Sequence, residues 1–179
     1  MTCPNCEELP RKVQGDLWLY LWPPLGHTRK KLDNWAADRR APAIADEKSA
    51  IAIVLPDDRR SSDIVELAGL LTDKEQNDTK ALALPAHTVP SFADFPRVTS
   101  LKTIVGRHQA DWLLDMLAAK RLTSHFQPIF ETALPLKPFG FEALLRGRHA
   151  DGSTVPAGHI FKAASDANLA FQTDLQARL

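Results

Sequence analysis

Two short apolar runs predict the strands of a small N-terminal domain. Residues 16–22 (DLWLYLW) lie between Gly15 and Pro23, and residues 50–55 (AIAIVL) end at Pro56. Runs of this length between turn residues are typical of buried strands. Between them, the apolar spacing predicts a helix that Thr28 caps and that runs to about residue 40. Strand, helix and strand with short links indicate a βαβ unit, and hence a small α/β domain.

A capping box marks the start of a further helix. Thr72 is followed three residues later by Glu75, and this spacing lets each residue bond the backbone N–H of the other. We expect the helix that starts here to run to about Leu84, where Pro85 ends it.

The next part of the chain joins this domain to the C-terminal third. Residues 85–96 have the composition of a proline-rich connection, in which Phe92 and Phe95 are the expected packing anchors. Residues 100–122 form the longest helical pattern. Gly106 weakens its middle by about 1 kcal/mol relative to alanine, so two consecutive helices are the alternative to one. This segment either transmits a signal or only packs against the small domain.

Strict alternation predicts a strand over residues 139–146 (FGFEALLR). One face carries Phe139, Phe141, Ala143 and Leu145, and the other carries Gly140, Glu142, Leu144 and Arg146. At about 3.3 Å per residue, Glu142 and Arg146 lie roughly 13 Å apart, too far for an ion pair. The run 125–131 predicts a second strand, on which Gln127 points away from the neighbouring phenylalanines.

This strand face carries a carboxylate, an apolar surface and a guanidinium in one row, which suits a particular class of ligand. Such a ligand has a metal-bound phosphate, a flat base and a second phosphate. On spacing alone, an exposed polar strand face is the alternative.

The motifs FQPIF, FEALLR and DGSTVP follow one another at short spacing in the C-terminal part of the chain. Over about residues 125–179, this order resembles the opening of the EAL family of cyclic di-GMP phosphodiesterases. The resemblance implies a modified TIM-type barrel that linearises cyclic di-GMP by metal-assisted hydrolysis. Asp151 and Gly152 match the family's loop, for which a simple Asp-Gly turn is also a sufficient explanation.

The resemblance also implies roles for single residues. Glu142 resembles the first carboxylate that binds the metal, Mg²⁺ or Mn²⁺. Gln127 and Arg146 resemble contacts to the dinucleotide. Leu144 and Pro156 resemble apolar contacts to a guanine.

The later motifs of the family cannot be placed in this sequence. A barrel of this class needs about 250 residues, whereas 33 of the 179 residues follow Arg146. Hydrolysis with two metal ions needs several converging carboxylates. We therefore expect the chain alone to be catalytically incomplete. The alternative is a non-enzymatic signalling or interaction protein with a degenerate EAL segment.

Together these patterns predict three regions. Residues 1–98 form a regulatory or sensor-like α/β domain, 99–123 a linker helix, and 124–179 the truncated opening of an EAL barrel. The uncovered sheet edges and apolar face of such an opening favour a homodimer.

Charge and cysteine content narrow the possible partners and location. With 22 basic and 22 acidic residues the formal net charge is zero, which argues against a nucleic-acid polymer or a membrane as partner. No signal-peptide pattern or long apolar run is present, so we expect a cytoplasmic location. The cysteines, Cys3 and Cys6, form an inert terminal pair, a redox pair, or a metal site completed by His27 and His87.

Overall fold

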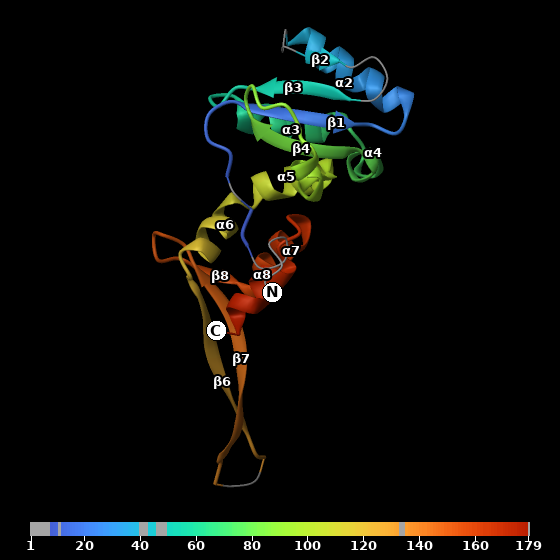
Figure 1. Cartoon of the computed structure of the whole chain (residues 1–179). Helices are drawn as coiled ribbons and strands as arrows, with labels where there is room; N and C mark the ends of the chain where they lie inside the picture. The colour runs from blue at the N-terminus through green and yellow to red at the C-terminus, as the bar shows by residue number, and fades with distance from the viewer. Residues whose placement is uncertain (1–7, 11, 40–42, 46–49, 133–134, 179) are drawn as a thin grey trace. The chain divides into compact units, whose positions relative to one another are not determined.

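The structure, a computed structural model, divides into two compact units (Figure 1). The N-terminal unit comprises residues 10–108, and the hairpin unit comprises residues 1–9 and 109–179. The residues described are 8–10, 12–39, 43–45, 50–132 and 135–178. Cys3 and Cys6 lie outside the described residues.

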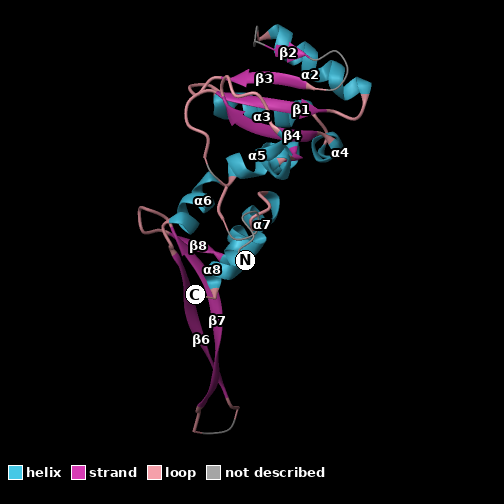
Figure 2. Ribbon diagram, viewed as in Figure 1, coloured by secondary structure: helices cyan, strands magenta, loops and turns pink. Residues whose placement is uncertain are grey.

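The N-terminal unit is built on a five-stranded sheet in the order β2-β3-β1-β4-β5 (Figure 2). Its elements are β1 (Leu17–Trp22), α2 (Gly26–Asp38), β2 (Ala43–Ala45), β3 (Ile51–Leu55), α3 (Arg60–Leu70), α4 (Asp73–Asp78), β4 (Lys80–Pro85), the 3₁₀ helix η1 (Phe92–Arg97), β5 (Thr99–Ser100) and α5 (Leu101–Gln109). Among the described residues, no helix of either unit combines the length and the hydrophobicity needed to cross a lipid bilayer.

The predicted βαβ pairing of the first two apolar runs is wrong. β1 and β3 are neighbours, but they pair antiparallel, with Leu19 opposite Ile53. β2 is also antiparallel to β3, so β1 and β2 run parallel with β3 between them. Helix α2 therefore joins β1 to β2 in a split βαβ arrangement. The sequence did not predict β2, because a strand of three residues is too short to give a clear pattern.

One face of this sheet carries the core of the unit. Leu17, Leu19 and Leu21 alternate along β1 and are buried against α2, α3 and α5, from which Leu32, Leu67 and Val105 contribute. The other side chains of β1 are half-buried. The alternation that predicted the strand therefore also determines which face the helices cover.

Thr28 does not cap α2, contrary to the prediction. The helix begins at Gly26 after Leu25, and no side chain caps it. Thr28 is buried within the first turns of the helix, and its hydroxyl donates to Glu75 instead.

The capping box of Thr72 and Glu75 is confirmed, but the helix that it starts is short. α4 ends at Asp78, and Lys80–Pro85 forms β4 between β1 and β5. The predicted extension to Leu84 is wrong because pairing on both sides outweighs the local helix preference of alanine and leucine.

Phe92 and Phe95 are not packing anchors. Both lie in η1 and are 95% and 72% exposed. Their rings stack on each other with centroids 6.4 Å apart. The prediction failed because a capping box between Ser91 and Asp94 forms this turn without burying its aromatic residues.

The long helical pattern over 100–122 divides into two helices, as the alternative interpretation expected. α5 ends at Gln109 and α6 (Asp111–Ala118) begins after Ala110. The break does not fall at Gly106, which is buried within α5.

The hairpin unit contains the two predicted C-terminal strands. After α6 come β6 (Leu122–Phe130), β7 (Pro138–Arg148), β8 (Thr154–Pro156), α7 (Ala157–Asp166) and α8 (Ala170–Ala177). The strands form an antiparallel sheet in the order β6-β7-β8. A second core joins α6 and α7 to this sheet, and Leu9 packs against it from the start of the chain.

Gly147 lets the helices approach β7 closely. A Cβ atom at this position would overlap Sδ of Met116 in α6 and lie 3.2 Å from Cδ1 of Ile160 in α7. Gly147 is buried, and both neighbours are fully buried. The space that a methyl group would need is therefore already occupied.

We predict that Gly147→Ala lowers the free energy of unfolding of the hairpin unit by about 1–3 kcal/mol, the usual cost of overpacking a core. Urea unfolding followed by circular dichroism measures it. The control is Gly158→Ala in α7, where a Cβ meets nothing within 4 Å. There the stability should be unchanged or rise by up to about 1 kcal/mol. Equal effects of the two substitutions would contradict the close approach.

Candidate functional site

The pairing of β6 with β7 and β8 gathers the predicted site residues on one face of the sheet. Gln127 lies opposite Glu142, and Arg146 lies opposite Pro156. Leu144 lies on β7 between Glu142 and Arg146, two residues from each. Residues opposite each other in an antiparallel pair point to the same side. The structure therefore places all of these residues on a single surface.

Two further residues belong to this surface. His125 lies opposite Leu144, and Thr123 lies opposite Arg146. Neither was predicted as a site residue, because their position follows only from the pairing of the two strands. We call the face formed by Thr123, His125, Gln127, Glu142, Leu144, Arg146 and Pro156 the polar face.

The polar face differs in exposure along its length. Gln127 and Glu142, toward the hairpin end, are exposed, whereas Leu144 and Arg146 are half-buried. The Nη1 atom of Arg146 donates to the carbonyl oxygen of Leu145 at 2.7 Å, which orients the guanidinium. The face thus presents a solvated carboxylate at one end and a partly fixed cation at the other.

The described residues do not form a complete metal site. The polar face carries one carboxylate, that of Glu142. Across the described part of the chain, no group of three His, Cys, Asp or Glu side chains could hold a metal ion. Mg²⁺ is bound by one or two carboxylates together with substrate phosphates and water. Glu142 could be one such ligand, and the polar face carries no second carboxylate.

The loop between β7 and β8 is a simple Asp-Gly turn, as the alternative interpretation expected. Oδ1 of Asp151 accepts from the hydroxyl of Ser153 at 2.7 Å and from its backbone N–H at 2.8 Å. These bonds lower the pKa of Asp151. Gly152 has φ +87°, a conformation that side chains disfavour.

The sequence of this unit matches a known family. Residues 110–178 match the family model of the EAL domain. This match is consistent with a partial EAL domain in the C-terminal part of the chain. The match begins at α6 and covers the hairpin, β8 and both C-terminal helices, which is consistent with a segment of a TIM-type barrel. EAL domains are of the cyclic di-GMP phosphodiesterase type. No curated protein matches the chain.

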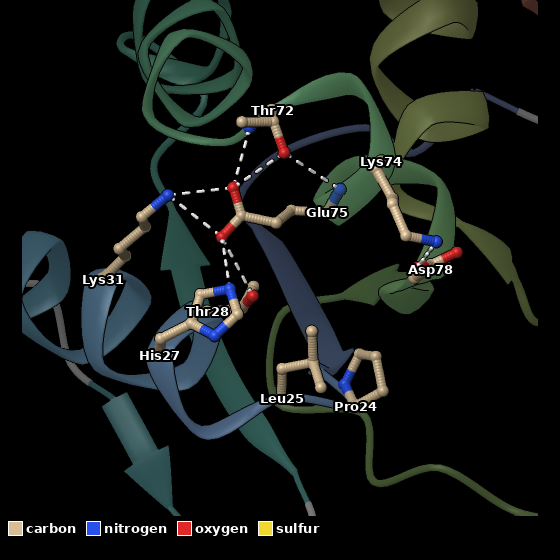
Figure 3. A pocket seen from close by; sticks show the side chains of 9 residues that line it. All are labelled: Pro24, Leu25, His27, Thr28, Lys31, Thr72, Lys74, Glu75 and Asp78. Atoms are coloured by element: carbon tan, nitrogen blue, oxygen red, sulfur yellow. Dashed lines mark hydrogen bonds and ion pairs between the residues drawn. The ribbon is translucent and has the colours of Figure 1, made fainter.

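A pocket of about 330 Å³ lies in the N-terminal unit, outside the EAL domain (Figure 3). It lies where α2 and α4 begin. Its lining residues are Pro24, Leu25, His27, Thr28, Lys31, Thr72, Lys74, Glu75 and Asp78. The sequence patterns predicted the capping box at this place but not the pocket.

Glu75 is the centre of this pocket and is only 7% exposed. Lys31 donates to both of its carboxylate oxygens, at 2.8 and 2.9 Å. Thr28 donates at 3.0 Å, and Thr72 donates from its N–H and its hydroxyl at 2.9 Å each. Nε2 of His27 lies 3.3 Å away. Figure 3 shows these groups converging on the carboxylate.

These bonds lower the pKa of Glu75 to about 2, the bond from Lys31 having the largest effect. Both oxygens already accept several donors, so we interpret Glu75 as a clamp that joins α2 to α4 and not as a metal ligand. His27, a candidate metal ligand of the sequence analysis, lies at this clamp. His87, the other candidate, contacts the ring of Trp18. The metal hypothesis for the cysteine pair stays a prediction.

We predict that the Glu75 clamp makes the N-terminal unit sensitive to acid. Because the pKa is lower in the folded state, the carboxylate stabilises the fold above about pH 4.5, and this stabilisation is lost as the pH falls toward 2. Glu75→Gln should lower stability at neutral pH and flatten its dependence on pH in this window. Urea unfolding followed by tryptophan fluorescence measures both effects.

A matched control tests whether the buried position matters. Asp33 on α2 also pairs with a basic residue, Arg29, but is 48% exposed. Asp33→Asn should change stability little. If Asp33→Asn destabilises the unit as much as Glu75→Gln does, the clamp is not specific to Glu75.

Proposed function

We propose that the partial EAL domain binds cyclic di-GMP on the polar face of its sheet. The observation that supports this is the strand pairing, which brings Gln127, Glu142, Leu144, Arg146 and Pro156 to one surface. The family match independently supports a cyclic di-GMP domain at the same residues.

Each residue of the face has a role in this proposal. Arg146 donates to one phosphate of the dinucleotide, and its charge strengthens the bond. Glu142, roughly 13 Å along the strand, binds a Mg²⁺ or Mn²⁺ ion that contacts the other phosphate. Gln127 contacts the dinucleotide beside Glu142. Leu144 and Pro156 pack against a guanine.

In this proposal the chain alone binds cyclic di-GMP and does not hydrolyse it. Hydrolysis of a phosphodiester with two metal ions needs several carboxylates around ions about 3.5–4 Å apart, and the polar face carries one. The N-terminal unit then acts as a regulatory or sensor-like module in the same chain as the nucleotide site. A chain that binds a bacterial second messenger in this way acts in the cytoplasm.

The second candidate function is a protein-interaction module with a degenerate EAL segment. The observation that favours it is the exposure of several large apolar residues on the hairpin, among them Phe139 at 77%. A protein that uses only this surface would bind no nucleotide, so titration with cyclic di-GMP separates the two functions.

We predict that Arg146→Ala weakens binding of cyclic di-GMP by roughly tenfold to a hundredfold, because a hydrogen bond to a charged group contributes about 1.5–3 kcal/mol. Isothermal titration calorimetry measures the affinity. Arg178→Ala is the control, since it removes the same charge from an exposed residue at the end of α8. Absence of binding by the unmodified chain, or equal loss in both variants, would contradict the proposed site.

We predict a separate, metal-dependent effect at Glu142. If this carboxylate binds an ion that contacts cyclic di-GMP, Glu142→Gln should abolish the increase in affinity that Mg²⁺ produces. The affinity measured without Mg²⁺ should change far less. Glu131→Gln, an exposed glutamate just after β6, is the control. The same increase with Mg²⁺ in all three proteins would exclude Glu142 as the metal ligand.

A further inference from the structure

The polar face carries a histidine that the proposed contacts to cyclic di-GMP do not use. His125 lies on β6, directly opposite Leu144 on β7. Its neighbours on the same side of β6 are Thr123 and Gln127, because side chains two residues apart on a strand share a face. The imidazole therefore stands in the middle of the proposed nucleotide site, so its role rests on the proposed binding of cyclic di-GMP.

The spacing of side chains on the sheet places His125 closer to the base than to either phosphate. Side chains directly opposite in an antiparallel pair have Cβ atoms about 4.5–5.5 Å apart, and diagonal neighbours are roughly 7 Å apart. Leu144 is the direct neighbour of His125. Glu142 and Arg146, two residues to either side of Leu144, are diagonal neighbours. A guanine that packs on Leu144 is therefore the part of the ligand nearest to the imidazole.

The order of the strands places His125 at one edge of this base. β7 lies between β6 and β8, and Pro156 of β8 lies opposite Arg146 of β7. A guanine that packs against Leu144 and Pro156 thus lies over β7 and β8. Its other edge points toward β6, where His125 stands. An apolar surface under the ring and a polar group at its edge are the usual means by which a site fixes a flat ligand.

Guanine and adenine differ in the groups that such an edge presents. Guanine presents two acceptors, N7 and O6, whereas adenine presents N7 as an acceptor and its 6-amino group as a donor. An imidazole carries at least one N–H donor. The negative phosphates on either side of the base attract N–H groups, so we expect His125 to present a donor. This donor would bond O6 of guanine but would find no acceptor at position 6 of adenine.

A role for His125 as a metal ligand is less favoured. Mg²⁺ takes oxygen ligands, and Mn²⁺ is also suited to carboxylate and water, whereas imidazole suits metals such as zinc. Glu142, the proposed ligand of the ion, is also only a diagonal neighbour of His125. The chemistry and the spacing therefore both favour the base.

We propose that His125 donates a hydrogen bond to O6 of the guanine that packs on Leu144. This contact makes the site prefer cyclic di-GMP to cyclic di-AMP. Leu144 and Pro156 hold the ring of the base, and His125 determines which purine is accepted.

Isothermal titration calorimetry with cyclic di-GMP and cyclic di-AMP tests the proposal. The unmodified chain should bind cyclic di-GMP more tightly. His125→Ala should lower the ratio of the two affinities by about threefold to tenfold, as expected for the loss of one hydrogen bond. His125→Gln, which keeps an N–H donor, should retain most of the ratio. A ratio that is unchanged in His125→Ala would overturn the proposal.

Ser124→Ala is the matched control. Ser124 precedes His125 and lies opposite Leu145, on the other face of the hairpin, so this variant should leave both affinities unchanged. Two further results with His125→Ala would refute the proposed contact. Equal weakening of both dinucleotides would place the imidazole on a phosphate or a ribose. Loss of the increase in affinity that Mg²⁺ produces would place it on the ion.

A changed ligand tests the same contact without any change in the protein. Cyclic di-IMP keeps O6 and N7 of guanine and lacks its 2-amino group. If O6 is the atom that the site recognises, the unmodified chain should bind cyclic di-IMP more tightly than cyclic di-AMP. An affinity for cyclic di-IMP as low as that for cyclic di-AMP would assign the preference to the 2-amino group and refute the proposal.

These titrations separate the role of His125 from the proposed function on which it rests. If the unmodified chain binds neither cyclic di-GMP nor cyclic di-AMP, the proposed nucleotide site is wrong, and the role of His125 fails with it. If Arg146→Ala weakens binding of cyclic di-GMP while His125→Ala keeps the preference for guanine, the nucleotide site stands and only the role of His125 is refuted.

Discussion

The candidate site depends on the alignment of β6 with β7. Because side chains alternate across a strand, a slip of one residue would send Gln127 to the face opposite Glu142 and separate the proposed ligands. The base of the hairpin fixes this alignment, since Gly147 lies opposite Leu122 and directly against Met116 and has no room for a shift. The packing of a glycine against α6 and α7 thus determines which residues a nucleotide would meet.

The two units use carboxylates in opposite ways. Glu75 is buried, and its oxygens accept bonds from Lys31, Thr28 and Thr72, so it has little capacity left for a ligand and serves to join two helices. Glu142 is exposed on the sheet surface, where a phosphate-bound ion could approach it. Both residues are glutamates. The exposure of the carboxylate and the number of hydrogen-bond donors that it already binds distinguish the structural residue from the candidate metal ligand.

Local patterns predicted the strands of the hairpin and the capping box at Thr72, and they carried the EAL resemblance. Alternation and short motifs depend only on residues that are contiguous in the sequence. The sequence did not reveal β4 or the order of the first sheet, since these depend on pairing between distant segments. Thr28 illustrates the difficulty: its hydroxyl has the chemistry of a cap, but the nearest strong acceptor, Glu75, lies 47 residues away in the chain. His125 was missed for the same reason, as its place opposite Leu144 requires the alignment of two strands.

The path of the chain between the units limits how this protein can be divided. Leu9 packs into the hairpin unit, residues 10–108 form the other unit, and the chain returns at Gln109. Gln172 of α8 also donates to the carbonyl oxygen of Glu8 at 3.5 Å. The N-terminal unit is therefore an insertion, bounded on both sides by residues of the hairpin unit. A fragment that starts at the family match would lose the side chain of Leu9 from its core, so dissection of this protein must keep the first residues or replace them with a short bridge.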